Sequence, residues 1–257
     1  MSVCVFFVTF AGMKQAMIFA AGMGTRLKPI TDIMPKALVK VAGVPLLQRV
    51  ILKLKADGFS RIVVNVHHFS QQILDFLSAN DDFGVDIRIS DESDMLLETG
   101  GGLKKASALF ATDSPVLIHN VDILSNVDLR QLYNKAVADD TDVLMLVSPR
   151  DTKRYLLFND DMRLTGWTNI ATGEVKSPYP GLQPGQCHRY AFSGIHLLSP
   201  RLFDDMRHWP EKFGIIDFYL DVCAKANVKG YVKDDLRLLD VGKLDTLHDA
   251  EAFVSDC

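Results

Sequence analysis

The sequence has few cysteines, no block of like charge and no long apolar run. Its 257 residues include four scattered cysteines, and none belongs to a CxxC pair or a Cys/His cluster. This scatter argues against a structural zinc site and against disulfides, so we expect a reducing, cytoplasmic compartment. The 28 Lys and Arg against 32 Asp and Glu give a net charge of −4. Without a basic cluster there is no electrostatic case for nucleic-acid binding.

The first residues are apolar, but they do not match a membrane span or a signal peptide. Residues 1–12 read MSVCVFFVTFAG and carry no Lys or Arg. A span needs about 20 apolar residues, and a signal peptide begins with a basic segment. We therefore expect no membrane span, and we interpret residues 1–13 as an extension that results from a start codon placed too early. Residues 14–257 then form one domain, and a lipid-facing anchor is the less favoured alternative.

From Lys14 to residue 120 the chain alternates short apolar strands with amphipathic helices. Strands are expected at 16–20, 61–66, 85–89 and 115–120, and helices at 46–54, in a short segment capped by Ser70, and at 103–110 after a glycine loop. The first strand is a continuous apolar run, as in parallel strands that are buried on both faces. This order predicts a doubly wound, mostly parallel α/β sheet, in which ligands bind beyond the carboxyl ends of the strands.

The second half is less regular, and we expect it to add a sugar-binding elaboration to the same domain. Strands are expected at 142–148, 155–159, 191–198 and 236–241, and helices near 200–207, 215–226 and 243–254. A Gly/Pro-rich stretch at 172–186 is interpreted as an excursion loop. Neither an internal repeat nor a linker is visible in the sequence, which favours a single domain.

A glycine loop follows the first strand, in Ala20-Ala21-Gly22-Met23-Gly24-Thr25-Arg26-Leu27-Lys28-Pro29. Small residues let backbone N–H groups surround phosphate oxygens, and Arg26 and Lys28 would add charge-assisted hydrogen bonds. The loop lacks the third glycine of the dinucleotide motif G-x-G-x-x-G and the G-K-[ST] of the Walker loop, so both motifs are excluded. Taken alone, a G-x-G is equally well explained by a tight turn.

The next segment, Pro35-Lys36, favours the phosphate interpretation. Pro35 restricts the backbone and presents Lys36 from a fixed position. A cation held beside a phosphate-binding turn is what an attack on an α-phosphate requires. A single lysine is more often a solvated surface residue, but the glycine loop upstream makes a catalytic role the favoured one.

Three consecutive glycines, in Glu98-Thr99-Gly100-Gly101-Gly102, precede an expected helix. Such a run is costly to order, and a turn needs only one glycine. We interpret it as a close approach to a nucleobase or a sugar face, in preference to a flexible hinge.

Two aspartates follow apolar strands, in Asn120-Val121-Asp122 and in Leu238-Leu239-Asp240-Val241-Gly242. An acid at the carboxyl edge of the sheet lies where a Mg²⁺ that bridges phosphates would lie. Two carboxylates and water are enough to hold one Mg²⁺ and to leave positions for phosphate oxygens. Each aspartate alone could be a helix cap, but the pair, with Lys36 and the glycine loop, favours a magnesium site.

Together these segments resemble the sugar-1-phosphate nucleotidylyltransferases, from about residue 14 to residue 253. The chain has Val121-Asp122 where that family usually has Gly-Asp, which keeps the carboxylate and changes the loop that carries it. The short length, the E-T-G-G-G segment and Phe192-Ser193-Gly194-Ile195 are most similar to the N-acetylmuramate 1-phosphate uridylyltransferases of peptidoglycan recycling. The resemblance is carried by Gly22-Met23-Gly24-Thr25-Arg26-Leu27-Lys28-Pro29, Pro35-Lys36, Glu98-Thr99-Gly100-Gly101, Asn120-Val121-Asp122 and Asp240-Val241-Gly242.

The resemblance implies a Rossmann-like nucleotide-diphospho-sugar transferase fold and an Mg²⁺-dependent reaction. A nucleoside monophosphate passes from an NTP, with UTP favoured, to a sugar 1-phosphate, and pyrophosphate leaves. The family's catalytic and metal-binding positions fall on Arg26 and Lys36 and on Asp122 and Asp240. The implied nucleotide-binding residues are Ala20, Ala21, Gly22, Gly24, Thr25, Arg26, Asn65, Gln71 and Gly100, and the implied sugar-phosphate residues are Glu98, Ser193, Gly194 and Asp217. We expect a monomer or a homodimer.

Other functions stay open from the sequence. Guanylyl-, cytidylyl- or thymidylyl transfer would need only a few different loop contacts, and Pro35-Lys36-Ala37-Leu38 also suits the phosphocholine cytidylyltransferases. A choline site would want an aromatic box, whereas Phe158, Trp167 and Tyr190 are scattered. Trp167 is equally consistent with stacking on a sugar and with surface packing. A non-catalytic nucleotide-sugar sensor is less favoured because Lys36 and both aspartates are present, and a redox enzyme is less favoured because the third glycine is missing.

Overall fold

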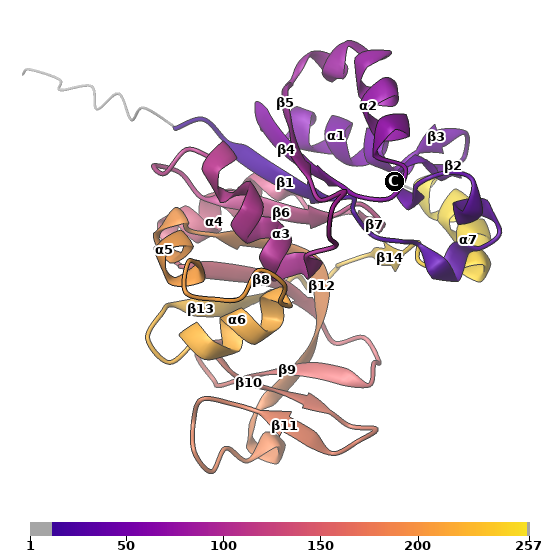
Figure 1. Ribbon diagram of the computed structural model, residues 1–257. Coiled ribbons are helices and arrows are strands. Elements are labelled where there is room, and N and C mark those ends of the chain that lie inside the picture. The colour runs from indigo at the N-terminus through magenta and orange to yellow at the C-terminus, as the bar shows by residue number, and fades with distance from the viewer. Residues whose placement is uncertain (1–11, 256–257) are drawn as a thin grey trace, which may run out of the picture.

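The fold is built on one large sheet with helices on both faces (Figure 1). The structure is a computed structural model, and it describes residues 12–255. Most of the predicted N-terminal extension, residues 1–11, therefore lies outside the described residues. Within residues 12–255 no helix combines the length and the apolar character that a membrane crossing needs.

Ten strands form the large sheet, and four more form two small antiparallel pairs among the described residues. The small pairs are β2 (Lys40–Val41) with β3 (Val44–Pro45) and β7 (Ile123–Ser125) with β14 (Leu238–Asp240). The strands of the large sheet are β1 (Gln15–Phe19), β4 (Arg61–Val66), β5 (Asp86–Asp91), β6 (Val116–Asn120), β8 (Val143–Ser148), β9 (Arg154–Phe158), β10 (Leu164–Asn169), β11 (Glu174–Lys176), β12 (His188–Leu198) and β13 (Val228–Val232). The helices are α1 (Leu46–Ala56), α2 (Ser70–Ser78), α3 (Glu98–Ala106), α4 (Leu129–Ala138), α5 (Phe203–Met206), α6 (Ile215–Val222) and α7 (Leu244–Ser255).

The centre of the sheet is parallel, and its strands are buried on both faces. β1 lies between β4 and β6, and β5 follows β4, all in parallel register. Successive residues of β1 enter two different cores: Ala16 and Ile18 pack with α1, α2, α4 and α7, whereas Met17 packs with α3, α5 and α6. Continuous apolar runs are what such two-sided burial requires. The predicted doubly wound, mostly parallel α/β fold is therefore confirmed.

The sheet divides at β12, the longest strand. Its carboxyl-terminal half pairs with β6 on one side and with β8 on the other, while its first residues pair with β9. The register with β8 shifts between Phe192 and His196, and Gly194 in that interval has a φ of 75°. Glycine adopts this left-handed conformation at little cost. The residues of β12 before this irregularity pair with the antiparallel part of the sheet, β9–β10–β11, which lies at the lower end of the molecule in Figure 1.

Some local predictions were wrong. The helix expected at 103–110 begins at Glu98, so the three glycines lie inside α3 and not in a loop before it. Ser70 is the first residue of α2 and not its cap, because the preceding Phe69 occupies the cap position without a side-chain hydrogen bond. The expected loop at 172–186 contains β11, and β10, β13 and α4 had no predicted counterparts.

Candidate functional site

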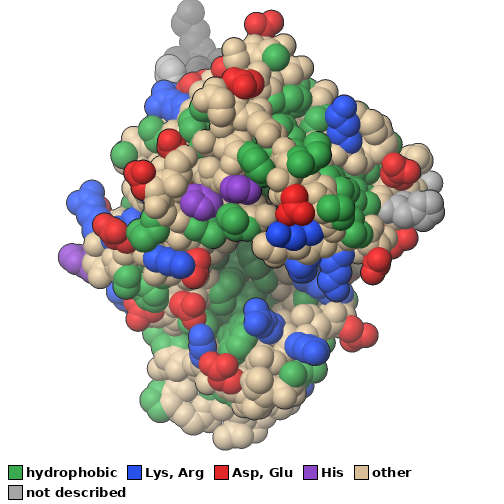
Figure 2. All heavy atoms as spheres, turned by 45° about the vertical axis from the view of Figure 1, so that its right-hand side comes forward, with side chains coloured by type: hydrophobic (Ala, Val, Ile, Leu, Met, Phe, Trp, Pro, Cys, Tyr) green, Lys and Arg blue, Asp and Glu red, His purple; other side chains and the backbone are tan. Residues whose placement is uncertain are grey.

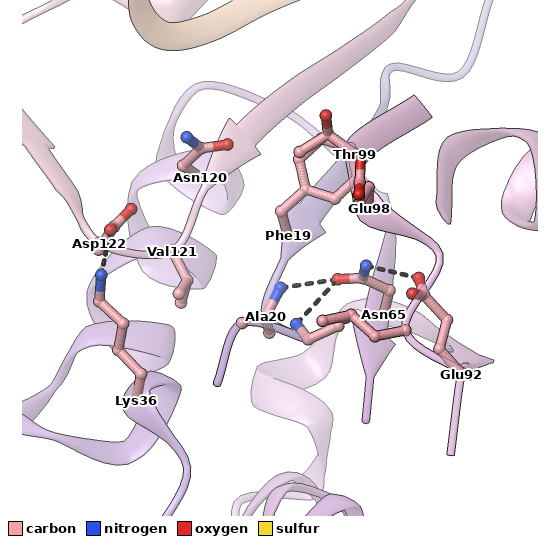
Figure 3. Close-up of a pocket in the computed structure, with 13 residues that line it drawn as sticks. Phe19, Ala20, Lys36, Asn65, Glu92, Glu98, Thr99, Asn120, Val121 and Asp122 are labelled. Carbon is pink, nitrogen blue, oxygen red and sulfur yellow. Dashed lines mark hydrogen bonds and ion pairs between the residues drawn. The ribbon is translucent and has the colours of Figure 1, made fainter. Parts of the chain in front are cut away.

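A cavity of about 430 Å³ lies at the carboxyl ends of β1, β4 and β6 (Figure 3). Parallel strands end at the same edge of a sheet, and open α/β sheets bind ligands there. The lining residues come from the segments that follow these strands and from the start of α3. They are Phe19, Ala20, Ala21, Gly22, Lys36, Asn65, Glu92, Leu96, Glu98, Thr99, Asn120, Val121 and Asp122.

Asn65, at the end of β4, holds the start of the glycine loop in place. Its Oδ1 accepts hydrogen bonds from the backbone N–H groups of Ala20 at 2.7 Å and Ala21 at 3.3 Å. Its Nδ2 donates to Oε1 of Glu92 at 2.7 Å, and Oε2 of Glu92 accepts from the N–H of Leu97 at 3.1 Å. Asn65 and Glu92 are both buried. The side chain predicted to contact base or ribose therefore also fixes the backbone from which the cavity is built.

The glycine loop has the tight geometry that its sequence predicted. Gly24 has a φ of 61°, and its carbonyl oxygen accepts from the N–H of Leu27 and from the hydroxyl of Thr31, both at 2.8 Å. A Cβ at Gly24 would come within 2.8 Å of Cγ2 of Thr31. Any larger residue would thus strain the turn. Gly22 lines the cavity, while Thr25 and Arg26 are exposed to solvent beside it.

Lys36 and Asp122 form an ion pair at the cavity wall (Figure 3). Lys36 follows Pro35 in a short 3-10 turn and is 8% exposed. Asp122 follows β6, and its side chain is 18% exposed. The carbonyl oxygen of Asp122 accepts from the N–H of Val241 at 2.8 Å, which ties the end of β14 to this point. Two segments far apart in sequence are therefore held on one edge of the sheet.

Asp240 lies beside the same ion pair. Burial of its carboxyl group, and then the negative charge of Asp122, raise its pKa above the ordinary value. Lys36, Arg26 and Arg150 oppose that rise because their positive charges are close. A Cβ at Gly242 would lie 2.6 Å from Oδ1 of Asp240 and 2.7 Å from Nη2 of Arg26, which places the guanidinium of Arg26 next to this carboxylate. The structure thus brings Arg26, Lys36, Asp122 and Asp240 together.

The two aspartates suit a hard divalent cation. Mg²⁺ in proteins is bound through one or two carboxylates and completes its shell with water and substrate phosphates. After burial, the negative charge of Asp122 is the second cause of the raised pKa of Asp240, and a cation between the two carboxylates would remove that repulsion. Residues 12–255 contain no group of three or more His, Cys, Asp or Glu arranged for a metal. Asp122 and Asp240 would supply two oxygens of such a shell, and water and substrate phosphates would supply the rest.

The predicted sugar-phosphate residues lie on the other side of the cavity and beyond it. A Cβ at Gly214 would lie 3.2 Å from Oδ2 of Asp217 and 3.9 Å from Oε2 of Glu98, so these carboxylates flank one glycine. A Cβ at Gly194 would lie 2.8 Å from Nδ2 of Asn120, which lines the cavity. Ser193 is buried, with no hydrogen-bond partner for its Oγ among the described residues.

A second pocket of about 550 Å³ opens between the β9–β10–β11 sheet and α6. Asp217 belongs to it, and Glu98 belongs to the first cavity, so the two spaces meet at Gly214. Figure 2 shows a hollow on this face with hydrophobic side chains in its depth and Lys and Arg side chains along its lower rim. The second pocket is lined by Arg150, Thr152, Arg154, Leu156, Trp167, Asn169, Glu174, Lys176, Phe192, Ile216, Asp217 and Leu220.

Two predicted nucleotide contacts, Gly100 and Gln71, lie outside the cavity lining and stay predictions. Gly100 does not line the cavity: a Cβ there would overlap the ring of Phe213, and its N–H donates to the carbonyl of Phe213 at 2.9 Å. The glycine run therefore allows α3 to pack closely on neighbouring protein segments. Gln71 is exposed on α2, where its Nε2 donates to Asp75 at 2.8 Å, and it too lies outside the cavity lining.

Several residues of the two pockets were not predicted. Glu92 lies in an irregular segment after β5, and only the fold shows that it is buried against Asn65. Arg150 and Arg154 lie just outside the strands expected at 142–148 and 155–159, and Lys176 lies in the stretch interpreted as a loop. Their signal was weak, because single charged residues in a polar segment are common on protein surfaces.

Comparison with known proteins agrees with this geometry. A family model described as nucleotidyl transferase matches residues 15–256. The N-acetylmuramate alpha-1-phosphate uridylyltransferase of Caulobacter vibrioides is 31% identical over 233 residues, which cover 87% of this chain and 90% of the relative. The protein of the same name from Neisseria meningitidis is 40% identical over 190 residues, covering 74% and 77%.

Solved structures share the fold. A putative glucose-1-phosphate thymidylyltransferase from Bacillus anthracis superimposes with a TM-score of 0.79 at 19% identity, and the match covers 95% of this chain and 96% of that chain.

Proposed function

The chain belongs to the nucleotidyl transferase family, and we propose that it transfers the uridylyl group of UTP to a sugar 1-phosphate. The observation that carries this proposal is the meeting of Arg26, Lys36, Asp122 and Asp240 beside a glycine loop at the carboxyl edge of the sheet. Two cations and two carboxylates beside a glycine loop suit a triphosphate with its divalent cation.

The reaction needs positioning and charge rather than a protein nucleophile. A phosphate oxygen of the sugar 1-phosphate forms a bond to the α-phosphorus of UTP, the bond from that phosphorus to the bridging oxygen of the β-phosphate breaks, and pyrophosphate leaves with the electron pair. Gly22, Gly24 and Thr25 would surround the triphosphate, and Arg26 would bind its β- and γ-phosphates. Lys36 would neutralise charge that develops at the α-phosphate.

Asp122 and Asp240 would hold Mg²⁺, and the cation would supply further charge neutralisation at the phosphates. Before substrate binds, the ion pair with Asp122 keeps Lys36 at the cavity wall. Asp122 would then serve the cation, and the ammonium of Lys36 would be available to bind the α-phosphate. The same pair thus holds both groups in place in the free enzyme.

The choice of base and acceptor is supported by the relatives. The two relatives described above are named for N-acetylmuramate α-1-phosphate and uridylyl transfer, and this chain aligns with most of their length. Ala20, Ala21 and Asn65 are the positions at which base and ribose would lie, since all three line the cavity at the end of β1. We also propose a cytoplasmic enzyme, because its substrates are phosphorylated metabolites and Cys187 and Cys223 are free thiols.

A matrix of four NTPs against a panel of sugar 1-phosphates, scored by pyrophosphate release, tests the proposal. We expect release only when both substrates and Mg²⁺ are present, with UTP at least about tenfold better in kcat/KM than CTP, GTP or dTTP. A higher rate with another NTP would mean that the enzyme prefers a base other than uracil. Absence of release with every pair would instead support a non-catalytic sensor of nucleotide sugars.

A further inference from the structure

The second pocket presents one continuous face of the β9–β10–β11 sheet to the substrate. Leu156 of β9 pairs with Trp167 of β10, which pairs with Lys176 of β11. In the neighbouring row Arg154 pairs with Asn169, which pairs with Glu174, and all six residues line the pocket. Side chains in alternate positions of a strand share one face. The sheet thus offers an apolar and aromatic centre with charged groups at its ends.

The positively charged side chains of this face differ in whether they already have a carboxylate partner. Nζ of Lys176 contacts Asp217 at 2.9 Å and Glu174 at 4.0 Å, and it also lies 5.4 Å from the centre of the Trp167 ring. These contacts account for both carboxylates of the pocket. Lys176 therefore helps to build the wall and is not free to bind an anion.

Arg150 and Arg154 have no carboxylate partner within residues 12–255. Arg150 donates from Nη2 to the carbonyl of Phe192 at 3.1 Å. Two residues further on, a Cβ at Gly194 would lie 2.8 Å from Nδ2 of Asn120, which lines the first cavity, so Arg150 lies at the end of the second pocket that is nearer to that cavity. The guanidinium of Arg154 has no hydrogen-bond acceptor in the described chain, and it lies in the Asn169 row, at the edge of the aromatic centre.

We propose that Arg154 is a specificity-determining residue that binds a carboxylate carried by the acceptor sugar, while Arg150 contacts its 1-phosphate. The proposal rests on the proposed function and names the acceptor class: sugar 1-phosphates with an additional acidic substituent. Two separated arginines without partners match a ligand with two separated anionic groups, because a guanidinium binds carboxylate or phosphate with two parallel hydrogen bonds. Trp167, which lines the same pocket, would lie against the apolar face of the sugar ring.

The test compares two acceptors that differ only in the acidic group. N-acetylmuramate α-1-phosphate carries a lactyl ether, and N-acetylglucosamine α-1-phosphate has a hydroxyl group in its place. With UTP and Mg²⁺ we expect the wild-type enzyme to prefer the acidic sugar, and we expect Arg154→Gln to lower the ratio of the two kcat/KM values about 10- to 100-fold. Arg154→Lys keeps the charge but loses the two-bond geometry, so it should fall between the two.

Lys153→Gln is the matched control, since it removes one positive charge from the adjacent exposed residue, which does not line the pocket. It should leave the ratio within about twofold of wild type. An unchanged ratio in Arg154→Gln, or a wild-type enzyme that uses both sugars equally, would overturn the assignment of Arg154. Neither result affects uridylyl transfer itself, which fails only if no sugar 1-phosphate supports pyrophosphate release.

Discussion

The two sides of the substrate cleft are built in different ways. On the nucleotide side, Asn65, Glu92 and Lys36 are buried, and each is held by hydrogen bonds or an ion pair to a neighbouring strand end. On the side proposed for the acceptor, Arg150 and Arg154 are exposed, Arg150 in the loop that follows β8 and Arg154 at the start of β9. Phosphoryl chemistry needs fixed charges, whereas acceptor choice needs only complementary ones. The difference suggests that reaction type and substrate preference can change independently.

The largest effect should come from the nucleotide side. Lys36→Ala should lower kcat about 10³-fold, because a positive charge at the α-phosphate is lost where the transition state needs it. Folding should change little: Asp122 loses its partner, but its side chain is partly exposed and can be hydrated. We expect the melting temperature to fall by no more than about 4 °C.

Lys40→Ala removes the same charge from an exposed position in β2 and serves as the control. Its turnover should equal that of the wild type. Near-normal turnover of Lys36→Ala would remove this lysine from the mechanism and would leave the nucleotide side without its catalytic cation.

The second prediction concerns the metal. Asp240→Asn should raise the Mg²⁺ concentration for half-maximal activity by at least about tenfold, since one of two carboxylate ligands is lost. In the presence of EDTA the variant should be no less stable to heat than the wild type, because the substitution removes a repulsion between Asp240 and Asp122. A Mg²⁺ titration and a thermal melt check both points, and an unchanged titration would contradict the two-carboxylate site.

A smaller effect is expected from Asn65, which supports the start of the glycine loop. Asn65→Ala leaves the N–H groups of Ala20 and Ala21 and the carboxylate of Glu92 without a partner, so unfolding should become easier by about 1–3 kcal/mol. The KM for UTP should rise, because the glycine loop begins at these two alanines. The control, Gln72→Ala, removes an exposed carboxamide that donates to Ile33. Equal urea midpoints for the two variants would show that Asn65 does not fix the loop.

The same contrast explains which features the sequence could reveal. The apolar runs of β1, β4 and β6 were recognisable because two-sided burial leaves continuous hydrophobic segments, and the groups that follow those strands were predicted from that position. β11 was not recognisable, since all three of its residues are exposed and carry no alternation.

The glycine run has a packing role that the sequence did not indicate. Sequence shows that Gly100 and Gly101 allow a close approach, but only the fold shows that the approaching groups are Phe213 and Glu211. Glu92 and Arg154 were missed likewise, because the role of a single charged residue is decided by partners that are distant in the chain.

The smallest effect should come from two buried histidines on neighbouring strands, one in β6 beside the nucleotide side and one in β12 beside the acceptor side. Burial lowers the pKa of His119 in β6 to about 4 and that of His196 in β12 to about 3. The Nδ1 of His119 lies 2.7 Å from the carbonyl of Asn120, whereas neither ring nitrogen of His196 has a hydrogen-bond partner among residues 12–255. The ring of His196 packs against those of Tyr219 and Phe192.

Both histidines should make stability depend on pH in the same direction. The unfolded chain binds a proton at each histidine below a pKa of about 6.5, whereas the folded protein does not, so stability is complete above pH 6.5 and falls as the pH drops toward the folded values. Each histidine contributes at most about 1.4 kcal/mol per pH unit in that range. His196→Leu should make the urea midpoint depend less on pH between pH 5 and 6.5. It should not lower the midpoint at pH 8, because no hydrogen bond is lost. His188→Leu serves as the control, since it removes an exposed histidine whose Nε2 lies 3.0 Å from Oδ1 of Asp160. An unaltered slope in His196→Leu would mean that this histidine is already charged in the folded protein. The surroundings of His196, between Phe192 and Tyr219, would then be more polar than the structure implies.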